Sequence, residues 1–133
     1  MAKSIVTGYA RTWPREVFDI HKNKDLLIKR LELLRGTGVY VLYRDDRPYY
    51  VGQTTGSLFE RLHDHANKTT DKWYHLWNYF SAFEVPKGHL DEVEAILIAA
   101  MPTANSANPR IRPIPLPREI RRILADQRRI HVK

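Results

Sequence analysis

Cysteine is absent from this chain of 133 residues, and its absence removes several classes of protein at once. Disulfides, cysteine-based zinc sites and thiol nucleophiles are all excluded. Long hydrophobic runs are also lacking, because no stretch approaches the roughly 18 to 20 apolar residues that span a bilayer. The start of the chain carries neither an apolar core nor a small-residue cleavage site, so we expect no signal peptide. These absences favour an intracellular, cytoplasmic protein with no membrane partner.

Acidic residues are fewer than basic residues in this chain. The chain has 15 Asp and Glu against 22 Lys and Arg, a formal net charge of +7. Such a surplus predicts a polyanionic partner, nucleic acid first and an acidic membrane surface second. Residues 110–133 hold eight Lys and Arg against two acidic residues, so +6 of the total lies in this tail and +1 in residues 1–109. A merely solvated tail is the alternative interpretation.

The composition, with 43% hydrophobic and 28% charged residues, is that of a globular protein of one domain. Apolar periodicity and turn residues predict its elements. These are a helix at about residues 23–35, strands at residues 39–43 and 49–51 forming a hairpin, a helix at about residues 58–67, a strand within residues 76–85 and a helix at about residues 90–101. Ser57 and Glu60 form a capping box at the start of the second helix. Gly36 is a stop signal for the first helix.

Five of the eight prolines lie in residues 102–117, which indicates an extended, wrapping segment. Pro117 suits the first position of a final amphipathic helix. We therefore expect an α+β fold, a small three-stranded antiparallel sheet flanked by helices, with an extra N-terminal helix and a basic C-terminal helix. The expected division is an N-terminal arm and helix (residues 1–36), a core (residues 37–110) and a basic strap and helix (residues 111–133).

The helix at about residues 90–101 carries Glu94 inside its apolar face, whereas Glu92 points toward solvent. A carboxylate there is costly unless a basic residue or a metal ion pairs with it. A structural salt bridge and a metal ligand are both open. On the preceding helix, Arg61 and His65 lie four residues apart and share one side. Such a pair suits a phosphate, although basic pairs on surface helices are common. His63 and His65 face different directions and would not chelate one ion.

The hairpin brings Tyr40 and Tyr50 opposite or diagonal to each other across two strands. They can be ordinary strand aromatics. Gly38 and Gly52, however, stand inside the strand pattern, which indicates a bend or the close approach of another group.

Gly38-Val39-Tyr40, followed after nine residues by Tyr50-Val51-Gly52, resembles the paired signature that names the GIY-YIG nucleases. The resemblance continues in order over residues 37–110. Arg61 falls where the family carries its catalytic arginine, with His65 one turn later, and Glu94 falls where the family has its metal-binding glutamate. Asn105 resembles the asparagine that closes the motif set, with Asn108 as the nearby alternative.

The resemblance implies a metal-dependent DNA endonuclease in which Glu94 holds one Mg²⁺ or Mn²⁺ among waters, with RNA left open as substrate. The ion would stabilise the leaving 3′-oxygen and Arg61 would bind the non-bridging oxygens. Tyr40, hydrogen-bonded to Tyr50 or His65, would help deprotonate the attacking water. That role requires the metal and Arg61 to lower its pKa, which is ordinarily about 10.

The basic tail is the natural candidate for gripping nucleic acid through phosphate contacts. Its arginines are Arg110, Arg112, Arg118, Arg121, Arg122, Arg128 and Arg129. The main alternative is a nucleic-acid-binding module that keeps the fold but does not cut. A third is an adaptor whose basic tail docks on an acidic partner. The oligomeric state and the substrate specificity stay open.

Overall fold

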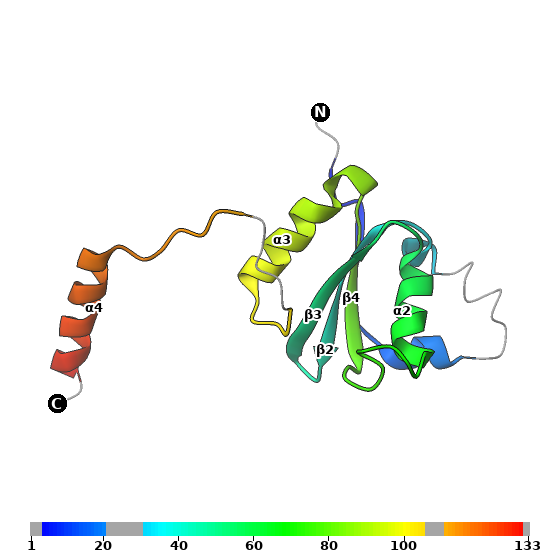
Figure 1. Ribbon diagram of the computed structural model, residues 1–133, viewed down its shortest axis with the longest axis horizontal. Helices are drawn as coiled ribbons and strands as arrows, with labels where there is room; N and C mark the ends of the chain where they lie inside the picture. The colour runs from blue at the N-terminus through cyan, green and yellow to red at the C-terminus, as the bar shows by residue number, and fades with distance from the viewer. Residues whose placement is uncertain (1–3, 21–30, 106–110, 132–133) are drawn as a thin grey trace.

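The computed structural model describes residues 4–20, 31–105 and 111–131. These residues form an α+β fold with one four-stranded antiparallel sheet in the order β1-β4-β2-β3 (Figure 1). The strands are β1 (Gly8–Pro14), β2 (Gly38–Arg44), β3 (Arg47–Thr54) and β4 (Tyr79–Glu84). The helices are α2 (Leu58–Asn67), α3 (Leu90–Ala100) and α4 (Arg118–His131), with short 3-10 helices η1 (Arg15–Asp19), η2 (Glu32–Arg35) and η3 (Lys87–His89).

The predicted hairpin is confirmed as β2 and β3. Its turn contains Asp45 with φ 57°, a left-handed conformation that Asp tolerates better than most residues. Leu42 pairs with Tyr50, but Tyr43 already pairs with Pro48, so Tyr49 is an extra residue in β3. This β-bulge lies immediately before Tyr50, and bulges re-aim the side chains around them.

The sheet carries a hydrophobic layer on each face. Tyr40, Leu42 and Phe80 pack with α2 on one face. Val39, Val41 and Val51 pack with α3 on the other. Figure 1 shows the two helices on opposite sides of the sheet. The alternation along β2 follows from the two-residue period of a strand, and it places Tyr40 on the α2 side.

The predicted helices of the core are confirmed. Ser57 caps α2, since its Oγ accepts a hydrogen bond of 3.3 Å from the Glu60 amide. Leu58 and Leu62 of α2 are fully buried. In α3, Leu90 is buried and Val93 and Leu97 pack against the same cluster. The strand expected within residues 76–85 is β4.

The prediction of three strands is wrong, because β1 adds a fourth along β4. Residues 8–14 lie in a region read from the sequence as a loop or arm. The period-2 signal is broken there by a register shift between Ala10 and Trp13, and Thr12 has φ 49°. The helix predicted at residues 23–35 lies mostly outside the described residues. Its last part is η2, which ends at Gly36 as expected.

The final helix is confirmed as α4, whose first backbone hydrogen bond runs from the Arg121 amide to the Pro117 carbonyl. Its apolar side is exposed, by 43% at Ile120 and 53% at Ile123. In Figure 1 it lies away from the sheet. Of the helices among the described residues, none combines the length and the apolar character needed to cross a membrane.

Candidate active site

Tyr40 and Tyr50 lie on adjacent strands and face α2. Tyr50 stands opposite Leu42, so it is diagonal to Tyr40, and the two ring centroids are 6.3 Å apart. Gly52 is directly opposite Tyr40. A Cβ at Gly52 would lie 2.5 Å from both Cζ and Oη of Tyr40, so any larger residue would displace this ring. The predicted close approach at Gly52 is therefore confirmed.

Gly38 shows the same requirement at the start of β2. A Cβ there would collide with the Phe83 carbonyl oxygen and with the side chain of Leu58. The absence of a side chain at Gly38 thus lets β4 and the start of α2 pack closely against β2. Gly52 is therefore needed for packing around the tyrosines, and Gly38 for packing of β2 against β4 and α2.

His65 is 1% exposed and lies between Tyr40 and Asp71. Its Nδ1 is 2.9 Å from each carboxylate oxygen of Asp71, and its Nε2 is 2.8 Å from the Tyr40 hydroxyl. A carboxylate only accepts hydrogen bonds, so Nδ1 carries the proton. Nε2 then accepts the hydrogen of the Tyr40 hydroxyl. The result is a hydrogen-bonded triad that runs from Tyr40 through His65 to Asp71.

Burial sets the protonation states of Tyr40 and His65 in this triad. Burial lowers the pKa of His65, and the hydrogen bond and charge of Asp71 oppose that shift only in part. Burial likewise raises the pKa of Tyr40 well above its ordinary value, helped by Tyr50 and opposed by Arg61. The expected lowering by Arg61 is present but is outweighed by burial. At neutral pH, Tyr40 is therefore protonated and His65 is neutral.

Arg61 is exposed and lies one helical turn before His65. Its positive charge lowers the pKa of Tyr40, which places the guanidinium near that hydroxyl. Because the hydrogen of the Tyr40 hydroxyl goes to His65, the oxygen can accept from the nearby Arg61. Because the guanidinium is also open to solvent, Arg61 can reach a ligand at the same place.

Glu94 is half-buried on α3, the helix that packs against the other face of β2 and β3. Burial raises the pKa of Tyr50, and the charge of Glu94 is the largest electrostatic contribution to that shift. The carboxylate therefore acts on the tyrosine that neighbours Tyr40. Figure 1 shows α3 beside β3.

The donor set around Glu94 limits the metal it can hold. Among the residues that the structure describes, no three His, Cys, Asp or Glu side chains gather as a metal site. A Mg²⁺ ion often binds through one or two carboxylates and keeps several waters, whereas structural Zn²⁺ takes four protein ligands. A single carboxylate such as that of Glu94 could hold Mg²⁺ or Mn²⁺ only together with water and phosphate oxygens.

Asn105 is not part of the hydrogen-bonded triad of Tyr40, His65 and Asp71. Its amide pairs with the backbone of Val51, with hydrogen bonds of 2.9 Å to Oδ1 and 2.8 Å from Nδ2. The Ala104 amide donates to the Tyr49 carbonyl at 2.7 Å. Asn105 thereby holds the strand between Tyr50 and Gly52. Asn108 and Arg110 lie outside the described residues.

Two contributors to the site carry no signal in the sequence. Asp71 lies in the loop after α2, where helical spacing predicts nothing. Trp73 follows it, and its ring stacks on Tyr50 with centroids 4.5 Å apart. Asp71 also accepts a hydrogen bond of 2.8 Å from the Trp73 amide, so one carboxylate orients both the histidine and this loop.

The arginines of the C-terminal segment are exposed, and Figure 1 shows α4 lying away from α2 and from the sheet that carries β2 and β3. Those described are Arg112, Arg118, Arg121, Arg122, Arg128 and Arg129. Searches of protein-family models, of curated proteins and of solved structures find no match to this chain.

Proposed function

We propose that this protein is a metal-dependent DNA endonuclease that hydrolyses phosphodiester bonds with an active site of the GIY-YIG type. The observation that carries the proposal is the meeting of Tyr40, Tyr50, Arg61 and His65, which come from three separate elements. Glu94 acts on the same cluster through its charge. These are five of the six residues that the resemblance singles out for catalysis and metal binding; the sixth, Asn105, pairs with the backbone of Val51 instead.

The hydrogen bonds give the proton of the attacking water a path. Tyr40 accepts that proton on its oxygen as its own hydrogen passes to Nε2 of His65. Asp71 stabilises the imidazolium that forms, because its carboxylate holds the Nδ1 proton. A tyrosine with a raised pKa can serve here, since it relays a proton and never needs to stand as a free phenolate. General-base catalysis of this kind contributes about 10²–10⁴-fold.

Charge neutralisation falls to Arg61 and Glu94. The guanidinium of Arg61 offers a planar fork to the non-bridging phosphate oxygens, next to the Tyr40 oxygen that receives the proton. Glu94 would hold the Mg²⁺ or Mn²⁺, which supplies stabilisation of the leaving 3′-oxygen when bound. Asn105 keeps β3 in place, and through it Tyr50.

Plasmid nicking by the purified protein tests this function. We expect nicking with Mg²⁺ or Mn²⁺ and none with EDTA. Glu94→Ala should lower the rate by at least about a hundredfold, the scale of removing one electrostatic stabiliser. Glu92→Ala is the matched control, because Glu92 is exposed on the same helix and should leave nicking unchanged.

A wild-type protein that leaves plasmid, branched and single-stranded DNA intact in both metals would overturn the proposal. If that protein still binds DNA, the module that binds without cutting takes its place. Equal loss of nicking in both glutamate variants would show that Glu94 has no special role.

A further inference from the structure

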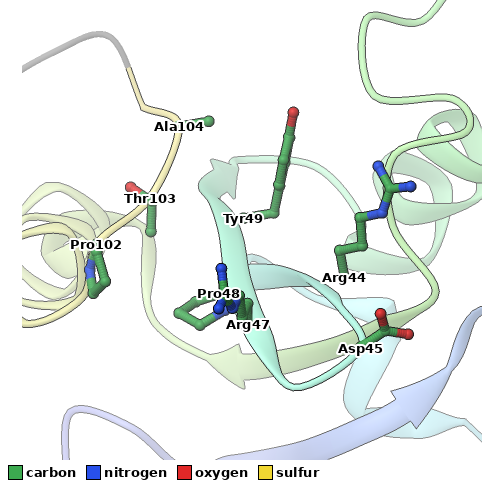
Figure 2. Close-up of a pocket in the computed structure, with 8 residues that line it drawn as sticks. All are labelled: Arg44, Asp45, Arg47, Pro48, Tyr49, Pro102, Thr103 and Ala104. Atoms are coloured by element: carbon green, nitrogen blue, oxygen red, sulfur yellow. The ribbon is translucent and has the colours of Figure 1, made fainter.

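A pocket at the β2–β3 turn is lined by residues that take no part in the proposed proton relay. It is lined by Arg44, Arg47, Pro48, Tyr49, Pro102 and Thr103, among others, and has a volume of about 760 Å³. Figure 2 shows the Tyr49 ring standing between the Pro102–Ala104 segment on one side and Arg44 on the other. A volume of this size falls in the range of small-molecule sites.

Two arginines line this pocket beside the turn. Arg44 and Arg47 are cross-strand partners beside the turn, an arrangement that costs stability. The nearby Asp45 carboxylate instead accepts a hydrogen bond from the Asn78 side chain at 3.0 Å. In the part of the chain that the structure describes, neither arginine has an ion pair. A bound anion would relieve the repulsion between them.

An aromatic row connects the pocket to the active site. The Tyr49 ring meets Trp73 edge-on at 5.4 Å, and Trp73 stacks on Tyr50 at 4.5 Å. The bulge in β3 explains the row, because it lets the consecutive residues Tyr49 and Tyr50 both contact Trp73. The Lys72 ammonium lies 4.9 Å from the centre of the Trp73 ring. Aromatic rings alternating with cations form the usual surface for single-stranded nucleic acid.

We propose that this pocket binds an unpaired nucleotide close to the scissile phosphate, so that the preferred substrate is DNA with single-stranded character beside the cut. Its base stacks on the Tyr49 ring, and its phosphate lies between Arg44 and Arg47. The proposal rests on the nuclease function proposed above. A base inside a paired duplex has no free face to offer, so the pocket discriminates paired from unpaired DNA.

The chain's charge favours nucleic acid over a protein segment as the occupant. The protein carries a net charge of +7, most of it in residues 110–133, and the pocket itself is lined by two arginines and one aspartate. The row of Tyr49, Trp73 and Tyr50 is continuous with the site that would hold the scissile phosphate. A nucleic acid, which carries both phosphate charges and flat bases, matches the arginines and the aromatic row.

Fluorescence anisotropy in EDTA, where metal-dependent cleavage stops, measures the binding. The probes are a labelled blunt duplex and a forked duplex of equal length with unpaired arms. We expect wild type to prefer the fork. Tyr49→Leu keeps an apolar side chain but removes the flat ring, and it should weaken fork binding by roughly tenfold while sparing the duplex. Arg44→Ala with Arg47→Ala should weaken fork binding and reduce its salt dependence.

Arg11→Ala is the matched control, an exposed arginine beside Tyr9 at the opposite edge of the sheet, and it should change little. The arginine variants are exposed, so their folding is not at issue. Equal affinity of wild type for both probes, or equal losses in the Arg11 control, would overturn the subsite. A fork preference lost in Tyr49→Leu, from a wild type that cuts nothing, would uphold the subsite and overturn the nuclease.

Discussion

Single residues decide where each proton lies in the candidate site. The two oxygens of Asp71 fix the proton of His65 on Nδ1, and this leaves Nε2 as the acceptor for Tyr40. Without the carboxylate, the imidazole could carry its proton on either nitrogen. In the proposed mechanism Asp71 is thus a positioning residue, because it acts through His65.

We predict that Asp71→Asn lowers the cleavage rate by about 10²–10⁴-fold, the contribution of a general base. The amide can donate to Nδ1, which would leave Nε2 protonated and unable to accept from Tyr40. Asparagine still accepts the Trp73 amide, so the loop keeps its shape. The rate is measured across pH together with the melting temperature.

The pH profile separates this role from a structural one. Burial holds the pKa of His65 below its ordinary value, while Asp71 raises it in part, with Arg61 lowering it and Asp64 raising it less. Cleavage should therefore be lost as pH falls through this lowered pKa. In Asp71→Asn the pKa falls further, so the acidic limb should move to lower pH. Asp64→Asn is the graded comparison: because the charge of Asp64 raises the pKa of His65 less than Asp71 does, the acidic limb should move in the same direction but by less.

At the scale of elements, the β2–β3 hairpin holds the tyrosines only because Gly52 lacks a side chain. We predict that Gly52→Ala destabilises the fold by about 1–3 kcal/mol, the range for overpacking a core. It should also weaken nicking, since the Tyr40 ring must move from His65. Thermal unfolding and the nicking rate check both effects.

Gly36→Ala is the matched substitution. A Cβ there meets nothing within 4 Å, and the backbone has φ −101°, which any residue adopts. Stability close to wild type is expected in this variant. A Gly52→Ala protein as stable and active as Gly36→Ala would contradict the packing account.

Elements with regular periodicity could be predicted from the sequence. The hairpin, α2, α3 and the diagonal tyrosines follow from two-residue or 3.6-residue spacing and from turn chemistry. Strand β1 could not, because its register shift and the positive φ of Thr12 break the alternation. The role of Asp71 could not be predicted for a related reason. Asp71 lies in a loop, and tertiary structure, not helical or strand spacing, determines where a loop residue lies.

At the scale of the whole molecule, the net charge and the candidate site occupy different parts of the chain. Most of the net charge lies in residues 110–133. The apolar side of α4 is largely exposed, so this helix adds little to the hydrophobic clusters on the sheet. The sheet with α2 and α3 holds the candidate site by itself.

We predict that removing residues 111–133 weakens DNA binding and flattens its dependence on salt. Each lost phosphate contact should lower the slope of log K against log salt by about 0.9. The melting temperature should stay close to wild type. Affinity measured from low to moderate salt checks the first outcome, and thermal unfolding the second.

A variant with Arg118, Arg121 and Arg122 changed to alanine keeps the length and helical propensity of the segment. It should reproduce part of the loss. Unchanged affinity in the truncation would mean that the tail is only solvated.

The pairing of Asn105 with Val51 also covers part of the outer edge of the sheet. Strand β3 is an outer strand of the sheet, and the unpaired amides and carbonyls of an outer strand invite a second chain to add to it. Ala104 and Asn105 occupy those groups at Tyr49 and Val51. The contact that steadies Tyr50 therefore also closes the middle of this edge to intermolecular strand addition, the first step toward aggregation.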